Sequence, residues 1–397
     1  MDLSNTPSIN GRGRTPTGKT EPRIISRLRA RQIWLDAQGF GRRIVAGKGV
    51  KAVTDVVRHL GYVQIDTINV IERCHHHILF TRLPSYKRGD LHKAQSKQKS
   101  VFEYWTHALA YVATEDYRFF KRAMAEHRAP PPPHFAKVGE DDTRRLLERI
   151  EREGPISIRD IDDDVLVEKD HAWASRKPSK KVLSKGFYDG VLTVSARSGM
   201  LKTYDLADRH FGWDGPPRPA SEDEVNAYVL ERALRAQGII SLDSACHLEA
   251  RRKPAIRALI EQRVALGELI PVLLKDDKTE HWVAPEVLER RAARSEPEAH
   301  ILSPFDPMII QRKRLELFFG YAHLFEAYVP PDKRVLGYFA LPVLYDGRIV
   351  AAIDIKADRQ AKRLMINKWT NFGEGGSEQQ RAVEDALQRF EIFQFAG

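Results

Sequence analysis

The chain has very few cysteines, the residues that most often build disulfide scaffolds and metal clusters. Among 397 residues there are only two, Cys74 and Cys246, and neither has a second cysteine nearby in the sequence. A disulfide framework, a Cys-based zinc site and an iron–sulfur cluster are therefore not expected. We predict no metal and no cofactor, and a reducing, cytoplasmic location.

Long hydrophobic runs are also absent. No stretch approaches the roughly 18 apolar residues that a membrane-spanning helix needs. Residues 1–22 contain no apolar core of the kind found in a signal peptide, and they carry several basic residues. We predict that residues 1–22 form a flexible basic tail and that the chain contacts no membrane.

Three widespread nucleotide and metal motifs are missing as well. The chain has no GxxxxGK[ST] phosphate loop, no GxGxxG after a strand and no HExxH pair. Nucleotide hydrolysis, dinucleotide redox chemistry and zinc-dependent peptide hydrolysis therefore have no support in the sequence.

The length and charge of the chain set its general class. Because an average domain has roughly 150 residues, 397 residues predict two to four modules. Lys and Arg number 64 against 54 Asp and Glu, which gives a net charge of +10. This excess favours a polyanionic partner, although a basic enzyme with a solvated surface has the same composition.

One pattern of elements occurs twice in the middle of the chain. From Asp142, and again from Ser221, a helix is followed by a short strand, a second helical segment, a third helix and a hairpin. In the second copy Ser221 precedes Glu224 by three residues, the spacing of a capping box. This order is typical of a winged helix, with Gly199 and the Asp276-Asp277 pair at the hairpin turns. Residues 24–95 show a weaker version of the same order.

The last hundred residues have a different character. Short β-like runs alternate with prolines from His300 onward, and Asp346-Gly347 is a strong hairpin signal. A closing helix follows a glycine-rich turn. This pattern predicts a small antiparallel barrel or sheet that is covered by a helix.

Two basic clusters lie in the helical parts of the repeated unit. The segment "KPSKKVLSKGF" contains Lys177, Lys180, Lys181 and Lys185, and the segment "HLEARRKPAIR" contains Arg251, Arg252, Lys253 and Arg257. Winged helices place basic helices against phosphate backbones, so we expect these clusters to contact duplex DNA. The alternative for each cluster is a solvated basic face.

The densest group of chemically useful residues lies between positions 62 and 86. Gln64 and Asp66 are two residues apart on an extended segment, so both side chains are expected on one side of it. A carboxylate beside a neutral amide can orient one water molecule, because the carboxylate accepts the proton while the amide holds the oxygen. The alternative is a polar face on a half-buried strand.

Three consecutive histidines, His75 to His77, follow this pair. Neighbouring residues on a helix point about 100° apart, so the three cannot all bind one metal ion. We therefore expect core packing or contact with phosphates or bases.

Five separated segments resemble one family. They are "VQIDTINVIERCHHHILFTRLPSY", "FEYWTHALAYV", "LKTYDLADR", "ILSPFDPMIIQRKRLELFFGY" and "IDIKADRQ". From about residue 24 to the C-terminus, in the same order, the chain is similar to the winged-helix DNA glycosylases of the YcaQ/AlkZ-like type. It departs from the family in the basic tail and in the four-proline run, Pro130 to Pro133.

The resemblance implies an α+β fold with three tandem winged-helix (helix-turn-helix) domains, followed by a small C-terminal antiparallel β-barrel. The expected bounds are 1–22 for the tail, 23–129 for the first winged helix with the catalytic pair, 130–139 for a proline-rich linker, 140–215 and 216–295 for the second and third winged helices, and 296–397 for the barrel with its C-terminal helix.

The resemblance also implies an activity. Family members have a Gln-x-Gln or a Gln-x-Asp pair, and this chain resembles the Gln-x-Asp branch, with Gln64 and Asp66 as the catalytic residues. It implies a monofunctional DNA glycosylase that removes alkylated purines such as N7-alkylguanine and unhooks interstrand crosslinks in base excision repair. We expect a monomer that binds damaged double-stranded DNA in the cytoplasm, in association with the nucleoid.

The expected DNA contacts are Arg73, His75, His76, Lys180, Lys181, Lys185, Arg251, Arg252, Lys253, Lys356 and Arg359. In the segment "IDIKADR", hairpin salt bridging that involves Asp354 is the alternative. A non-enzymatic winged-helix transcriptional regulator is the main alternative function, and a nucleoside or RNA hydrolase that uses the same pair is another.

Overall fold

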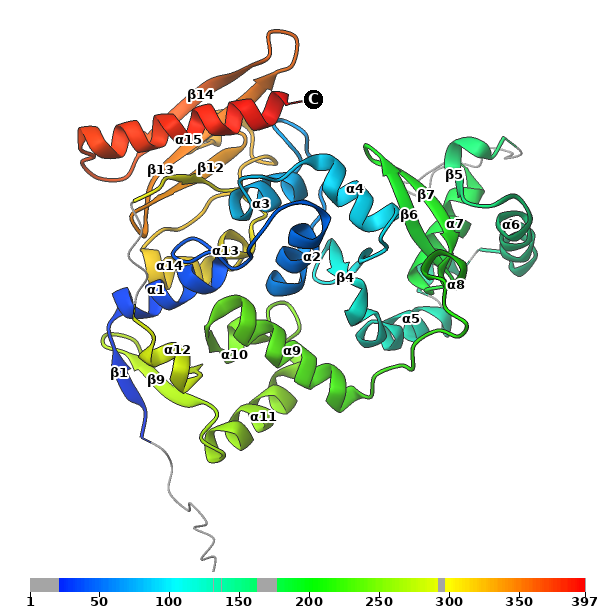
Figure 1. Cartoon of the computed structure of the whole chain (residues 1–397), viewed down its shortest axis with the longest axis horizontal. Helices are drawn as coiled ribbons and strands as arrows, with labels where there is room; N and C mark the ends of the chain where they lie inside the picture. The colour runs from blue at the N-terminus through cyan, green and yellow to red at the C-terminus, as the bar shows by residue number, and fades with distance from the viewer. Residues whose placement is uncertain (1–20, 131, 137, 163–176, 292–296, 397) are drawn as a thin grey trace, which may run out of the picture.

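The computed structural model describes residues 21–130, 132–136, 138–162, 177–291 and 297–396 (Figure 1). Almost all of the predicted basic tail lies outside these residues. The fold is a mixture of helices and four small sheets, as the sequence predicts. Within the described residues, no helix combines the length and the apolar character that crossing a membrane requires.

The first repeated unit contains the Gln-x-Asp segment. It consists of α2 (Gly49–Leu60), β2 (Val63–Gln64), α3 (Cys74–Arg82), α4 (Arg88–Ser96), β3 (Val101–Trp105) and β4 (Leu109–Ala113). Helix α2 buries Val53, Val56, Val57 and Leu60, which recur at helical spacing, and Gly61 ends it with a φ of 80°. The helix η1 (Thr114–Phe119) and α5 (Lys121–Arg128) lead to the second unit.

The same order of elements returns twice. The second unit has α6 (Glu140–Glu153), β5 (Ile156–Ser157), the short helix η3 (Ile158–Asp160), α7 (Pro178–Tyr188), β6 (Leu192–Ser198) and β7 (Leu201–Leu206), and α8 (Ala207–Phe211) follows it. The third has α9 (Glu222–Gln237), β8 (Ile239–Ser241), α10 (Leu242–Ala245), η4 (Ala250–Arg252), α11 (Lys253–Ala265), β9 (Ile270–Leu274) and β10 (His281–Val283), and α12 (Pro285–Glu289) follows it.

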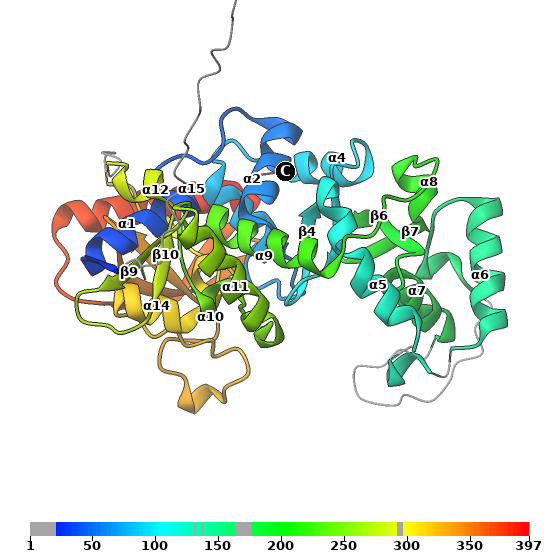
Figure 2. The ribbon, with the colours of Figure 1, turned by 90° about the horizontal axis from the view of Figure 1, so that it is seen from below.

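The three units share one strand arrangement. In each, the short first strand pairs antiparallel with the second strand of the hairpin, in the orders β2-β4-β3, β5-β7-β6 and β8-β10-β9. The capping box predicted at Ser221 and Glu224 is confirmed. In Figures 1 and 2 the second unit lies at one end of the molecule and the C-terminal sheet toward the other, with the first unit between them and the β9–β10 hairpin of the third unit on the same side as the C-terminal sheet.

The N-terminal segment does not pack as the predicted domain bounds imply. Strand β1 (Arg23–Ile25) pairs in parallel with β9 of the third unit, and α1 (Arg27–Gln38) buries Trp34 against Phe318. Helix α1 begins at Arg27, where the Ser26 side chain caps it. Residues 23–38 thus extend the core that the third unit shares with the C-terminal region.

The C-terminal strands form an open sheet. Strands β11 (His300–Ile301), β12 (Ala340–Tyr345), β13 (Arg348–Asp358) and β14 (Arg363–Asn371) lie antiparallel in that order, and α15 (Ser377–Phe395) packs against them. In the described residues β11 and β14 do not pair, so the expected closed barrel is not formed. With a two-residue strand at one edge, four strands offer too few pairings to close the sheet.

Part of the predicted β-like region is helical. The segment "PMIIQRKRLELFF" forms α13 (Pro307–Ile310) and α14 (Arg312–Phe319), and η5 (Pro331–Lys333) follows. Asp306 caps α13 through the backbone N–H of Met308, and Pro307 stands in its first turn. Pro307 and Pro331 therefore stand at helix starts, whereas Pro342 lies within β12.

A buried ion pair connects the first unit to this helical insertion. Arg82 at the end of α3 and Asp306 form a bidentate pair, both side chains are fully buried, and the second contact joins Nη2 to Oδ1 at 2.7 Å. Arg82 also donates to the backbone oxygen of Gln38 at 3.1 Å and lies over the ring of Phe40. Three segments far apart in the sequence therefore meet at one guanidinium.

Many histidines are buried and held neutral. Burial lowers the pKa to about 4 for each member of a set of six: His76, His77, His107, His281, His300 and His323. In the unfolded chain the same residues titrate near 6.5. Below pH 6.5 these histidines therefore bind protons in the unfolded state but not in the folded state.

We expect the free energy of unfolding to fall steadily as the pH drops from 6.5 towards 4. Urea unfolding at half-unit pH steps would measure how the free energy of unfolding depends on pH. The variant His77→Gln should show a shallower dependence, because an amide still donates to the carbonyl of Ile301 but takes up no proton. A stability that stays constant from pH 7 to pH 4.5 would contradict this expectation.

Candidate active site

Gln64 and Asp66 lie at the end of β2. Gln64 pairs with Ala110 on β4, its side chain is 7% exposed, and the backbone N–H of Ile65 continues the pairing by donating to Leu109 at 2.7 Å. Asp66 is partly exposed, and its Oδ1 accepts the backbone N–H of Ile68 at 2.8 Å. The amide is therefore fixed within the fold, whereas the carboxylate begins a turn and reaches solvent.

The segment after the pair is held from two sides. On one side the Cys74 thiol donates to the backbone oxygen of Gln64 at 3.0 Å. On the other, the backbone N–H of Ala357 in β13 donates to Val70 at 2.9 Å, and Arg359 donates to the backbone oxygen of Asn69 at 2.8 Å. The C-terminal sheet therefore fixes the loop that carries Asp66.

A third side chain, which the sequence analysis did not single out, completes the site. His107 lies in the turn between β3 and β4, and its Nε2 is 3.1 Å from Oε1 of Gln64. A signal was present in the sequence: the polar pair Thr106-His107 interrupts an aromatic, apolar run. Only the register of the hairpin, with Gln64 opposite Ala110, brings this turn beside the pair.

The same turn touches the other two units. On one side the ring of Trp105, which is 46% exposed, lies 6.1 Å from Tyr188 of the second unit. On the other, the His107 ring lies 5.9 Å from that of His247 in the third unit. The site therefore lies where all three repeated units meet.

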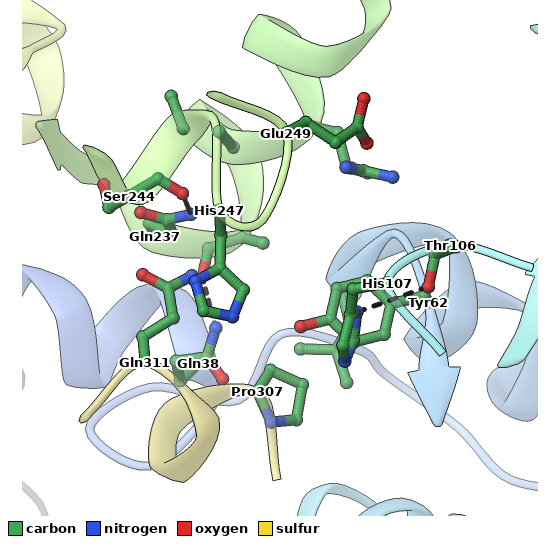
Figure 3. A pocket seen from close by; sticks show the side chains of 15 residues that line it. Gln38, Tyr62, Thr106, His107, Gln237, Ser244, His247, Glu249, Pro307 and Gln311 are labelled. Carbon is green, nitrogen blue, oxygen red and sulfur yellow. Dashed lines mark hydrogen bonds between the residues drawn. The ribbon is translucent and has the colours of Figure 1, made fainter. Parts of the chain in front are cut away.

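A small polar cavity lies beside His107 (Figure 3). In Figure 3, His247 points from the third unit toward Gln38 and Gln311, and His107 and Tyr62 lie on the opposite side. The volume of about 40 Å³ has room for a few water molecules but not for a purine. It is therefore too small to serve as a pocket for a base.

The histidines after the pair are mainly core residues. His75 is 4% exposed, and burial holds its pKa well below the usual value. His76 forms a hydrogen bond with the hydroxyl of Tyr86 at 2.6 Å, and His77 donates to Ile301 at 2.8 Å. The expected DNA contact of His75 does not fit this burial, because the helix turns it toward Tyr111. Core packing was the other interpretation of this triplet.

The lysines of the second unit differ in their exposure to solvent. Lys180 is exposed on α7, whereas Lys185 is paired with Asp189 at 2.5 Å and is largely buried. Lys181 is partly exposed. Lys180 is therefore better placed than Lys185 to reach a phosphate group.

The residues of the arginine-rich cluster in the third unit differ in the same way. Arg251 is exposed, whereas Arg252 is paired with Glu249 at 2.5 Å and Lys253 with Asp243 at 2.5 Å. The paired cations bridge the start of α11 to neighbouring turns. The partner of Arg252 is only three residues away in the sequence, whereas the partner of Lys253 lies in α10.

The remaining predicted contacts lie near the loop that carries Asp66 or on β13. Arg73 is partly exposed and donates to the backbone oxygen of Thr67 at 3.4 Å. Lys356 is exposed on β13, and Arg359 holds Asn69 as described above. Asp354 accepts the backbone N–H groups of Tyr338 and Phe339 rather than forming a hairpin salt bridge, because it is buried.

No group of three or more His, Cys, Asp or Glu residues that could hold a metal ion occurs in the described part of the chain.

Comparisons with known proteins give the family and the fold of the chain. A family model described as "DNA glycosylase AlkZ-like" matches residues 57–393. Among solved structures, the chain is similar to the DNA glycosylase AlkZ of Streptomyces sahachiroi, with a TM-score of 0.57 and 18% sequence identity, over 94% of this chain and 97% of that one. At this identity the likeness shows a shared fold.

The protein is therefore a DNA glycosylase. More specifically, the chain belongs to the AlkZ-like DNA glycosylase family, whose model covers most of its length, including the site at β2 and the C-terminal sheet.

Proposed function

We propose that this enzyme hydrolyses the N-glycosidic bond of alkylated purines, N7-alkylguanine above all, and unhooks interstrand crosslinks in base excision repair. It acts as a monomer on double-stranded DNA and leaves an abasic site. The three repeated units act as winged helices, the second and third with expected bounds of 140–215 and 216–295, and the first without residues 23–38, which pack with the third unit. The observation that carries the proposal is the fixed Gln64 amide beside a solvent-reaching Asp66 carboxylate, where the three units meet.

The chemistry begins with a good leaving group. Alkylation at N7 gives the purine a positive charge, so the bond between C1′ and N9 breaks with little protonation by an acid. The electron pair of that bond neutralises the departing base, and positive charge develops on the sugar. The site then has to stabilise an oxocarbenium-like sugar and supply a water molecule, the demand that glycoside hydrolases meet with carboxylates.

Asp66 and Gln64 divide this work. The Asp66 carboxylate faces the developing positive charge and accepts a proton from the attacking water as its oxygen bonds to C1′. The Gln64 amide holds that water and the sugar in place. No lysine accompanies the pair in sequence, so hydrolysis without a Schiff base is the proposed route.

The small volume of the cavity beside His107 supports action on bulky lesions. Many glycosylases flip the damaged base into a deep pocket. The cavity beside His107 is too small for a purine, so the lesion is proposed to remain exposed in the duplex. A crosslinked base, which cannot leave the helix freely, is then an acceptable substrate.

A duplex that contains N7-methylguanine at one position tests the proposal. The purified protein should release free N7-methylguanine and leave an alkali-labile site, in the absence of any added metal. Binding to a preferred undamaged sequence without base release would instead favour the alternative of a transcriptional regulator. Activity on free nucleosides only would favour a nucleoside hydrolase.

Binding should also depend steeply on salt. Each phosphate neutralised by Lys or Arg releases counterions, so six to ten contacts predict roughly a 10³–10⁵-fold loss of affinity between 50 and 200 mM salt. The slope of the logarithm of the binding constant against the logarithm of the salt concentration should become shallower by about one in Lys180→Ala. In Lys185→Ala this slope should stay unchanged, because Lys185 is paired with Asp189. Fluorescence anisotropy over a salt series measures both. A salt-independent affinity would argue against this DNA interface.

A further inference from the structure

The hydrogen bond between His107 and Gln64 defines how the amide of Gln64 is turned. A glutamine amide can rotate by half a turn and present either its oxygen or its N–H groups at nearly equal energy, unless a neighbour distinguishes them. Here Oε1 of Gln64 lies 3.1 Å from Nε2 of His107. An amide oxygen only accepts, so this contact requires a proton on Nε2.

The surroundings keep the imidazole neutral, with a single ring N–H. Burial, His247 and Arg232 lower the pKa of His107 to about 4, and Glu249 opposes them. The Tyr62 ring lies edge-on at 4.9 Å, and the Thr106 hydroxyl is 3.4 Å from Nδ1. That hydroxyl donates to the backbone oxygen of Ala108 at 3.2 Å, so the contact with Gln64 is the one that assigns the proton to Nε2.

From this contact we infer that His107 is a positioning residue, which holds the carbonyl oxygen of Gln64 so that the amide N–H groups face the substrate. The inference rests on the proposed function of the pair. With its oxygen occupied, Gln64 is a hydrogen-bond donor to the oxygen of the attacking water. The protons of that water then face Asp66, the acceptor. A rotated amide would present its own oxygen and compete with Asp66 for those protons.

The tautomer of His107 tests the arrangement directly. In the free, full-length protein labelled with ¹⁵N-histidine, the His107 signals, assigned by their loss in His107→Phe, should show a proton on Nε2. They should not titrate between pH 8 and pH 5.5. A proton on Nδ1, or titration near pH 6.5, would overturn the inference whether or not the protein releases bases.

A double-mutant cycle tests the consequence for catalysis. His107→Phe keeps an aromatic ring but removes the donor, so the single-turnover rate of base release should fall roughly tenfold, with DNA affinity changed less than about twofold. His107→Gln, which can donate from an amide, should recover part of the rate. His92→Phe, on the exposed face of α4, serves as the surface control.

The decisive comparison uses the Gln64→Ala background. If His107 acts through Gln64, adding His107→Phe to the Gln64→Ala variant should not lower the rate of base release further. Equal losses in both backgrounds would show that His107 acts independently, which overturns the inference. Absence of base release by the wild-type protein would instead remove the proposed function, and the tautomer measurement would still test the contact.

Discussion

Replacing Asp66 with asparagine should abolish measurable base release while leaving DNA affinity within a few-fold of the wild type. An amide at this position still accepts the backbone N–H of Ile68, so the turn keeps its geometry. It cannot accept a proton from water at neutral pH or offset positive charge on the sugar. General base catalysis contributes roughly 10²–10⁴-fold to a rate, and the lost charge adds to this.

Single-turnover release of N7-methylguanine and anisotropy binding should be measured on the same preparations. Asp277→Asn is a matched control, because Asp277 is also partly exposed and accepts the backbone N–H two residues ahead, at Thr279 in the hairpin turn of the third unit. It should release the base at the wild-type rate. Undiminished release by Asp66→Asn would remove Asp66 from the mechanism.

Arg82→Met should be among the most destabilising substitutions in the protein, lowering the free energy of unfolding by about 3–5 kcal/mol. The Arg82 side chain is fully buried, and its removal leaves the Asp306 carboxylate buried without its cationic partner. Because Arg82 also holds Gln38, the loss should loosen the contact between α1, α3 and α13. Urea unfolding followed by circular dichroism measures the change.

The double variant Arg82→Met, Asp306→Asn should recover part of the loss. Asparagine keeps the cap on α13 through the N–H of Met308, and no charge is left unpaired. Arg144→Met, which removes an exposed partner of Asp141, should change stability little. If Arg82→Met lowered the free energy of unfolding no more than Arg144→Met does, the Arg82–Asp306 pair would not be a determinant of stability.

Local sequence patterns predicted the repeated units well. Helix α2 follows from the spacing of its valines, and α9 follows from the capping box at Ser221. The hairpin turns at Gly199 and at Asp346-Gly347 also lie where the sequence places them. Each of these features depends on residues within one or two turns of each other, so no distant contact is needed to specify it.

The C-terminal region was harder to predict for a physical reason. Its prolines are compatible with both strand ends and helix starts, and at Pro307 the capping oxygen of Asp306 favours the helix. Whether a set of short strands closes into a barrel depends on strand number and stagger, which no short segment encodes. The open sheet is therefore a property of the assembled region.

The sequence by itself determined the Gln-x-Asp pair, the repeated helix, strand and hairpin order, and the near absence of cysteine chemistry. Tertiary structure decided that His107 meets Gln64 and that His75 lies in the core. It also decided that residues 23–38 pack with the third unit. Spacing along the chain fixes which face of an element a side chain occupies, but its partner across that face is set by the packing of segments far apart in the sequence.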